Sequence, residues 1–193
     1  MTLLSLDIAV KNRDINTVFT IGHSTRPFDK FIEILEAFRI EMVVDVRTIA
    51  KSRHNPQFNI DELKGGLEAH GIGYIHMAGL GGLRHTKIDS INTGWKNPSF
   101  RGYADYMQTL EFENSLEQLI TIAKGKVTAI MCAEAVPWRC HRSLIGDALL
   151  VRGIKVEDII SDRTSTSHKL TSWARVDGYT ITYPGEVLRC DVS

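Results

Sequence analysis

Residues 127–153 read VTAIMCAEAVPWRCHRSLIGDALLVRG. The apolar run 127–131 is typical of a buried strand, and apolar residues repeat at helical spacing from 144 to 149, before Gly153. The polar turn between them carries Cys132, Glu134, Pro137, Trp138, Arg139, Cys140, His141 and Arg142. A helix start points free backbone N–H groups outward and favours an anion or a thiolate. This strand-to-helix connection is therefore where we expect the chemistry.

The composition is that of an ordinary globular protein. The chain has 193 residues, of which 43% are hydrophobic and 24% charged, and its formal net charge is zero. A neutral chain has no global attraction to nucleic acid or membrane, so partner choice must come from local charge. Residues 1–10 lack the features of a secretory signal, and the three cysteines follow no disulfide spacing. We expect a cytoplasmic protein with no membrane partner.

The hydrophobic pattern alternates between two kinds of element. Short apolar runs predict strands at 18–21, 42–46, 74–77, 127–131 and 156–160. Helical spacing predicts helices at 28–38, at 59–71 with a capping box from Asn59 to Glu62, at 103–123 as one long or two short helices, and at 144–149. We expect an arm of uncertain structure at 1–16, a long surface loop at 88–98 and a hairpin within 179–188 that turns at Pro184-Gly185.

Alternating strands and helices indicate an α/β fold: one domain over 17–193, with a mostly parallel sheet and helices on both faces. Ligands of such sheets bind beyond the carboxyl ends of the strands. Polar residues follow the predicted strands at these ends, and we expect them to converge in space. They are His23 and Ser24; Asp45 and Arg47; Gly81, Gly82 and Arg84; Cys132 and Glu134; and His168.

Five motifs support a family resemblance. They are TIGHS at 20–24, VVDVR at 43–47, LGGLR at 80–84, MCAE at 131–134 with CHR at 140–142, and SHKLT at 167–171. Together they resemble the family called domain of unknown function 488. This resemblance implies a compact α/β domain with clustered motif residues and no established reaction. A looser likeness is to rhodanese and cysteine-phosphatase domains, although six residues separate Cys132 from Arg139 where those families have five.

One hypothesis is an enzyme of the cysteine-dependent hydrolase or transferase type. Cys132 or Cys140 would be the thiolate nucleophile, with His23 or Glu134 as proton carrier. The simpler alternatives are structural: Cys132 as a small buried hydrophobe, a salt bridge between Asp45 and Arg47, and His23 bonded to loop backbone.

The other hypothesis is a binding module for metal, nucleotide or nucleic acid. Cys132, Cys140, His141 and His168 are candidate metal ligands, but seven residues lie between the two cysteines and the chain has no CxxC pair. We therefore assign no metal ligand and expect well under one zinc or iron per purified chain. The sequence indicates no particular cofactor or oligomeric state.

Local positive charge favours an anionic ligand in either case. Basic side chains occur on predicted loops at one edge: Lys51, Arg53, Arg84, Lys87, Arg139, Arg142, Arg163 and Lys169. A phosphorylated small molecule fits this rim best, and nucleic acid is second. The predicted ligand-binding set is Ser24, Asp45, Arg47, Arg53, Gly81, Gly82, Arg84, His141, Arg142 and His168, with Arg142 as the anchor of the anion.

Overall fold

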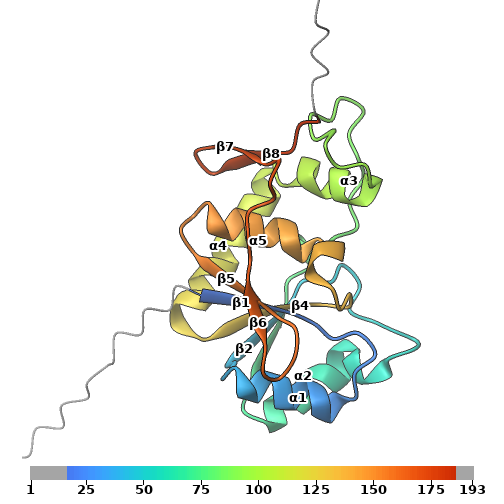
Figure 1. Ribbon diagram of the computed structural model, residues 1–193. Helices are drawn as coiled ribbons and strands as arrows, with labels where there is room; N and C mark the ends of the chain where they lie inside the picture. The colour runs from blue at the N-terminus through green and yellow to red at the C-terminus, as the bar shows by residue number, and fades with distance from the viewer. Residues whose placement is uncertain (1–16, 186–193) are drawn as a thin grey trace, which may run out of the picture.

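The computed structural model describes residues 17–185 (Figure 1). The predicted N-terminal arm, 1–16, and the last part of the predicted tail hairpin, from residue 186 on, lie outside the described residues.

A six-stranded sheet forms the centre of the described chain. Its strands are β1 (Thr17–Gly22), β2 (Met42–Asp45), β3 (Gly73–His76), β4 (Thr128–Cys132), β5 (Lys155–Ile159) and β6 (Ser165–Ser167). Their order across the sheet is β3-β2-β4-β1-β5-β6, and every pairing is parallel except that of β5 with β6. The predicted α/β fold with a mostly parallel sheet is confirmed.

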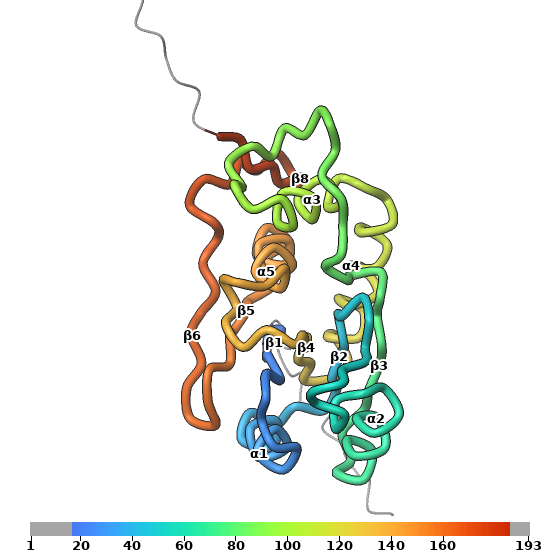
Figure 2. The backbone as a smooth tube through the Cα atoms, turned by 90° about the vertical axis from the view of Figure 1, so that its right-hand side faces the viewer, coloured from blue at the N-terminus to red at the C-terminus, as the bar shows by residue number. Residues whose placement is uncertain are grey.

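Helices cover both faces of the sheet. The helices α1 (Phe28–Ala37) and α2 (Ile60–Ala69) lie on one face, whereas α4 (Leu110–Gly125) and α5 (Arg142–Leu150) lie on the other, with α3 (Pro98–Tyr106) beyond them (Figures 1 and 2). Each strand contributes side chains to the core on both sides of the sheet, because successive side chains along a strand point to opposite faces. Val43 of β2 packs in the core under α1 and α2, and Val44 packs in the core under α4 and α5.

The predicted helices form. For 103–123 the sequence left open one long or two short helices, and the structure has two: α3, which begins earlier than predicted, at Pro98, and α4, which Thr109 caps by accepting a hydrogen bond from the Phe112 N–H at 3.3 Å. The predicted capping box at 59–62 is wrong, since the Asn59 side chain accepts a hydrogen bond from the Ser52 N–H instead of capping α2. The helix itself forms as expected.

The structure departs most from the prediction in the C-terminal part of the described chain, from β6 onward. The strand β6 was not predicted, and a separate hairpin of β7 (Arg175–Asp177) and β8 (Thr180–Thr182) turns at Gly178, which has a φ of 58°. The predicted hairpin that turns at Pro184-Gly185 has its second arm outside the described residues. Segment 88–98 is irregular up to α3, but Asn92 is fully buried and its side chain bonds Asp105 and the Tyr183 N–H, so this loop is not wholly at the surface.

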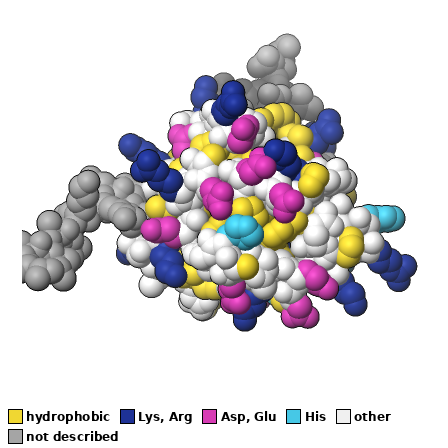
Figure 3. All heavy atoms as spheres, turned by 90° about the horizontal axis from the view of Figure 1, so that it is seen from below, with side chains coloured by type: hydrophobic (Ala, Val, Ile, Leu, Met, Phe, Trp, Pro, Cys, Tyr) yellow, Lys and Arg dark blue, Asp and Glu magenta, His cyan; other side chains and the backbone are white. Residues whose placement is uncertain are grey.

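Charges on the face that carries α1 and α2 are mixed. Lysine and arginine alternate there with aspartate and glutamate, and no area is dominated by one sign (Figure 3). Among the described residues, no helix is long and apolar enough to cross a membrane.

Candidate functional site

A pocket of about 410 Å³ opens where β2 and β4 end. We call it the site pocket. Its lining residues are Arg47, Thr48, Ile49, Gly82, Leu83, Ser99, Phe100, Cys132, Ala133, Glu134, Arg139, Cys140 and His141. A second pocket of about 390 Å³ adjoins it and shares Arg47, Ile49, Ala133 and Glu134; it adds His23, Ser24 and Lys51. The carboxyl ends of three adjacent strands, β1, β2 and β4, thus meet at one site, as parallel strands require.

The loop after β4 lies tightly against the end of β1. The N–H groups of His23 and Ser24 donate to the carbonyls of Cys132 and Ala133, both at 2.9 Å. Gly22 permits this approach, because a Cβ atom at that position would lie 1.9 Å from the Glu134 carbonyl oxygen. The Glu134 side chain is exposed at the rim of both pockets, and its Oε1 accepts from the Val136 N–H at 3.3 Å.

Cys132, Cys140 and His141, which we call the thiol cluster, come together at the site pocket. One ligand atom from each residue lies within 4.8 Å of the other two, and Cys140 Sγ is 3.6 Å from His141 Nδ1. The thiol of Cys132 hydrogen-bonds Cys140, and this bond, with help from His141 and Arg142, holds the pKa of Cys140 well below its usual value. The same bond, together with burial, raises the pKa of Cys132. These opposite shifts favour Cys140 over Cys132 as the more acidic thiol of the pair.

The ring of His141 is held from three sides. Its Nε2 lies 3.0 Å from the Val46 carbonyl oxygen, so Nε2 carries a proton, and Nδ1 faces the Cys140 sulfur. The Tyr103 ring lies 5.0 Å away, between ring centres. On the remaining side, a Cβ atom at Gly82 would lie 2.4 Å from Nδ1. The GG motif thus makes room for this imidazole.

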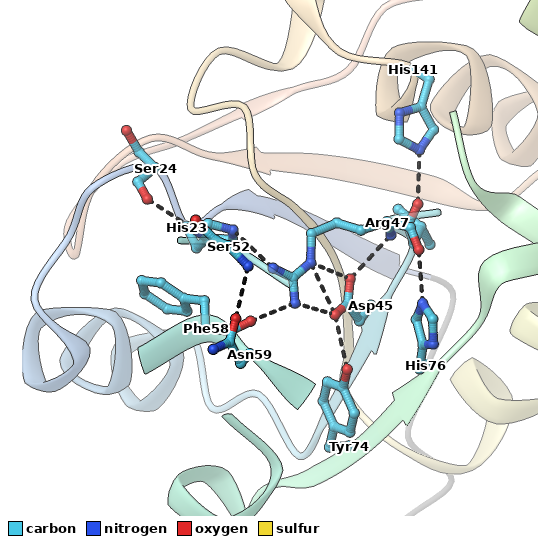
Figure 4. Close-up of polar contacts among 11 residues, drawn as sticks. His23, Ser24, Asp45, Arg47, Ser52, Phe58, Asn59, Tyr74, His76 and His141 are labelled. Atoms are coloured by element: carbon cyan, nitrogen blue, oxygen red, sulfur yellow. Dashed lines mark hydrogen bonds and ion pairs between the residues drawn. The ribbon is translucent and has the colours of Figure 1, made fainter. Parts of the chain in front are cut away.

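Arg47 and Asp45 form a buried ion pair under the pocket (Figure 4). Arg47 Nε donates to Asp45 Oδ1 at 2.9 Å, Nη2 also donates to the Phe58 carbonyl at 2.8 Å, and the Tyr74 hydroxyl donates to Asp45 Oδ2 at 2.9 Å. The structural salt bridge expected as the simpler alternative is present. Arg47 nevertheless contributes to the lining of both pockets.

His23 lies between the loop and Arg47. Its Nδ1 donates to the Ser24 carbonyl at 2.7 Å, and its Nε2 accepts from Arg47 at 3.3 Å. Burial lowers its pKa to about 4, and its ring stacks on Phe58 at 4.2 Å. His23 is therefore a neutral ring with both nitrogens engaged, which suits positioning of Arg47 better than proton transfer.

Arg142 is 1% exposed beneath the loop. Its guanidinium donates to Thr20 Oγ1 at 3.1 Å and to the Glu134 carbonyl, both uncharged, and its Nε has no hydrogen-bond partner among residues 17–185. A buried cation needs an opposite charge nearby. A Cys140 thiolate would meet this need, since Arg142 is among the groups that lower the Cys140 pKa.

Arg84 and Arg53 are among the predicted residues that do not line the site pocket. Arg84 stacks on the Tyr106 ring at 3.5 Å and donates to the Gly81 carbonyl, lining a neighbouring pocket with Gly82. Arg53 is an exposed loop residue that contributes to none of these pockets.

His168 belongs to a separate buried network. Its Nε2 lies 3.0 Å from Asp147 and its Nδ1 lies 3.2 Å from Asp158. Burial alone would lower the pKa of His168, but hydrogen bonds to these two carboxylates raise it to about 9. Asp158 also accepts from Thr20, which bonds Arg142, so the network reaches the underside of the site.

Several lining residues escaped sequence reasoning. Thr48, Ile49, Ser99 and Phe100 line the site pocket, and Tyr74 supports Asp45. The residues at 48 and 49 directly follow the VVDVR motif, which was the available signal. Ser99 and Phe100 belong to α3, and no local pattern indicates that α3 reaches this edge.

Fold and site together define an α/β domain with a paired-cysteine pocket at the carboxyl edge of its sheet. The chain belongs to the family described as domain of unknown function DUF488, whose model matches residues 27–149. No curated protein and no solved structure matches the chain, so the likeness to rhodanese and cysteine-phosphatase domains stays an expectation.

Proposed function

We propose that this protein is an enzyme that uses the Cys140 thiolate on an anionic, phosphorylated small molecule held in the site pocket. The observation that carries the proposal is the meeting of the thiol cluster with Arg47 and Arg139 around one pocket. The buried Arg142, with only uncharged hydrogen-bond partners, adds a reason for a permanent negative charge at Cys140.

The residues divide the work as follows. Cys140 Sγ forms a bond to the electrophilic centre of the substrate while the bond to the leaving group breaks. The leaving group takes a proton from Glu134, the exposed carboxyl at the rim. Water in a hydrolase, or a second acceptor in a transferase, then bonds to the electrophilic centre as its bond to sulfur breaks; the attacking group gives its proton to Glu134, and the Cys140 thiolate is restored.

Selective alkylation tests the nucleophile. At a pH of about 6.5, an ordinary cysteine is only about 1% thiolate, whereas Cys140 should be mostly ionised. Because a more acidic thiolate is also a weaker nucleophile, we expect iodoacetamide to modify Cys140 about tenfold faster in the folded protein than in the unfolded chain. Mass mapping of the modified cysteines over time measures both rates.

The matched variant is Cys132→Ser, which weakens the hydrogen bond that lowers the Cys140 pKa. Its Cys140 should react more slowly than that of the wild type at the same pH. Equal rates in folded and unfolded protein would end the nucleophile assignment and leave a binding site on the same loop.

Ligand screening tests the anion separately. Phosphorylated compounds should raise the melting temperature, and the increase should shrink as salt rises. Arg139→Ala, an exposed residue of the site pocket, should reduce the increase, whereas Arg163→Ala, exposed between β5 and β6, should not. If no phosphorylated compound shifts the melt, the substrate class is wrong. If only oligonucleotides raise the melting temperature, the protein is better described as a nucleic-acid-binding module.

A further inference from the structure

The thiol cluster has the arrangement of a metal site. Two sulfurs and one imidazole nitrogen face one another across less than 4.8 Å, although they come from the end of β4 and from the loop before α5. Thiolate and imidazole are the ligands that Zn²⁺ prefers, and three protein ligands with one open position are typical of reactive zinc sites.

The distance between Cys140 Sγ and His141 Nδ1 matches that expected for tetrahedral zinc. Typical Zn–S and Zn–N bond lengths place a sulfur and a nitrogen ligand about 3.6 Å apart in a tetrahedron. Cys140 Sγ and His141 Nδ1 are separated by 3.6 Å. The Zn²⁺ ion would lie between them and Cys132, with its fourth position toward the site pocket.

The surroundings of His141 are those of a metal ligand. Zinc-bound histidines usually donate their second ring N–H to a carbonyl or carboxylate, which fixes the ring and leaves the other nitrogen for the metal. Here Nε2–H donates to the Val46 carbonyl, and the ring occupies the space that a Cβ atom at Gly82 would fill.

We infer that Cys132, Cys140 and His141 bind one Zn²⁺ ion, whose open position takes water or an anion from the site pocket. The sequence argued against metal because the ligands are not paired at short spacing; the fold brings them together regardless. Zinc binding stands on ligand geometry alone. Its consequence, that bound zinc masks the Cys140 nucleophile, rests on the proposed function.

Competition with a coloured zinc chelator tests the site directly. The test uses the full-length protein with the substitution Cys190→Ser, so that Cys132 and Cys140 are its only cysteines. We expect one Zn²⁺ per folded chain, with no comparable binding of Mg²⁺ or Ca²⁺. Cys132→Ser and His141→Gln should each weaken the affinity at least about 100-fold, and His85→Gln, an exposed histidine outside the cluster, should leave it unchanged.

Gly82→Ala provides a test that removes no ligand. The added methyl group displaces the His141 ring, so zinc affinity should fall about 10-fold to 100-fold, as expected for a supporting position. Zinc binding that survives both ligand substitutions, Cys132→Ser and His141→Gln, or no binding by folded wild type, overturns the inference.

Alkylation with and without zinc separates the two proposals. Stoichiometric zinc should protect Cys140 from iodoacetamide, and a chelator should restore its reactivity. Fast alkylation unaffected by zinc would remove the metal site and keep the nucleophile. Tight zinc binding with slow alkylation of the zinc-free protein would keep the metal site and remove the nucleophile.

Discussion

Arg47→Ala is expected to lower the free energy of unfolding by about 3–5 kcal/mol, because it leaves a buried carboxylate without its cation. Asp45 is fully buried, and Arg47 supplies its only ion pair among the described residues. Tyr74 and the backbone N–H of residue 47 remain as donors, but neither is charged. Urea denaturation of the variant and the wild type measures the difference.

A surface pair provides the matched control. Lys30 and Glu33 also form an ion pair, but their side chains are 64% and 53% exposed. Lys30→Ala should therefore change stability by no more than about 0.5 kcal/mol. Arg47→Lys keeps the positive charge but loses the guanidinium that binds Asp45 through two nitrogens, so it should lower the free energy of unfolding less than Arg47→Ala does. If Arg47→Ala costs as little as Lys30→Ala, the pair contributes no stability and Arg47 is free to serve the ligand alone.

The second large effect is a loss of stability at alkaline pH through His168. Its pKa is raised from 6.5 to about 9 in the folded protein by Asp147 and Asp158. The folded state therefore holds a proton that the unfolded chain releases above pH about 6.5. This contribution is fully present below that pH and is lost as the pH rises through about 9. Its size is about 3 kcal/mol.

His168→Gln separates this contribution from other titrations. The variant should be less stable than the wild type by about 3 kcal/mol at a pH of about 6, and the two should converge by a pH of about 10. His54→Gln, at an exposed loop position, should follow the wild type throughout. A stability difference between His168→Gln and the wild type that stays constant with pH would show that the ring is not charged in the folded protein.

Burial decides how much of the fold could be predicted. Strands β1 to β5 contribute to cores on both faces of the sheet, so they appear as apolar runs. Strand β6 and the β7–β8 hairpin are short and mostly exposed, so composition gives no signal for them. The helix boundaries followed from the helical spacing, but the role of the Asn59 side chain did not, because a competing donor, the Ser52 N–H, is close only in the folded chain.

The candidate site was predictable where it depends on strand ends. His23, Arg47 and Cys132 follow three parallel strands, and the fold brings them together as expected. His168 was misplaced because β6 runs antiparallel to β5 and carries the chain back beside Val156. The contact of Gly82 with His141 has no local signature, since it joins segments far apart in the sequence.

The order of strands in the sheet differs from their order in the chain, and this affects how the pocket comes into being. During synthesis, β1, β2 and β3 leave the ribosome before β4, yet β4 fills the place between β1 and β2. Only when residues 128–132 pair with both β1 and β2 are the ends of these two strands held at one edge, and only then does Cys132 join the thiol cluster. The pocket therefore requires β4 to join three parts of the chain that are distant in sequence.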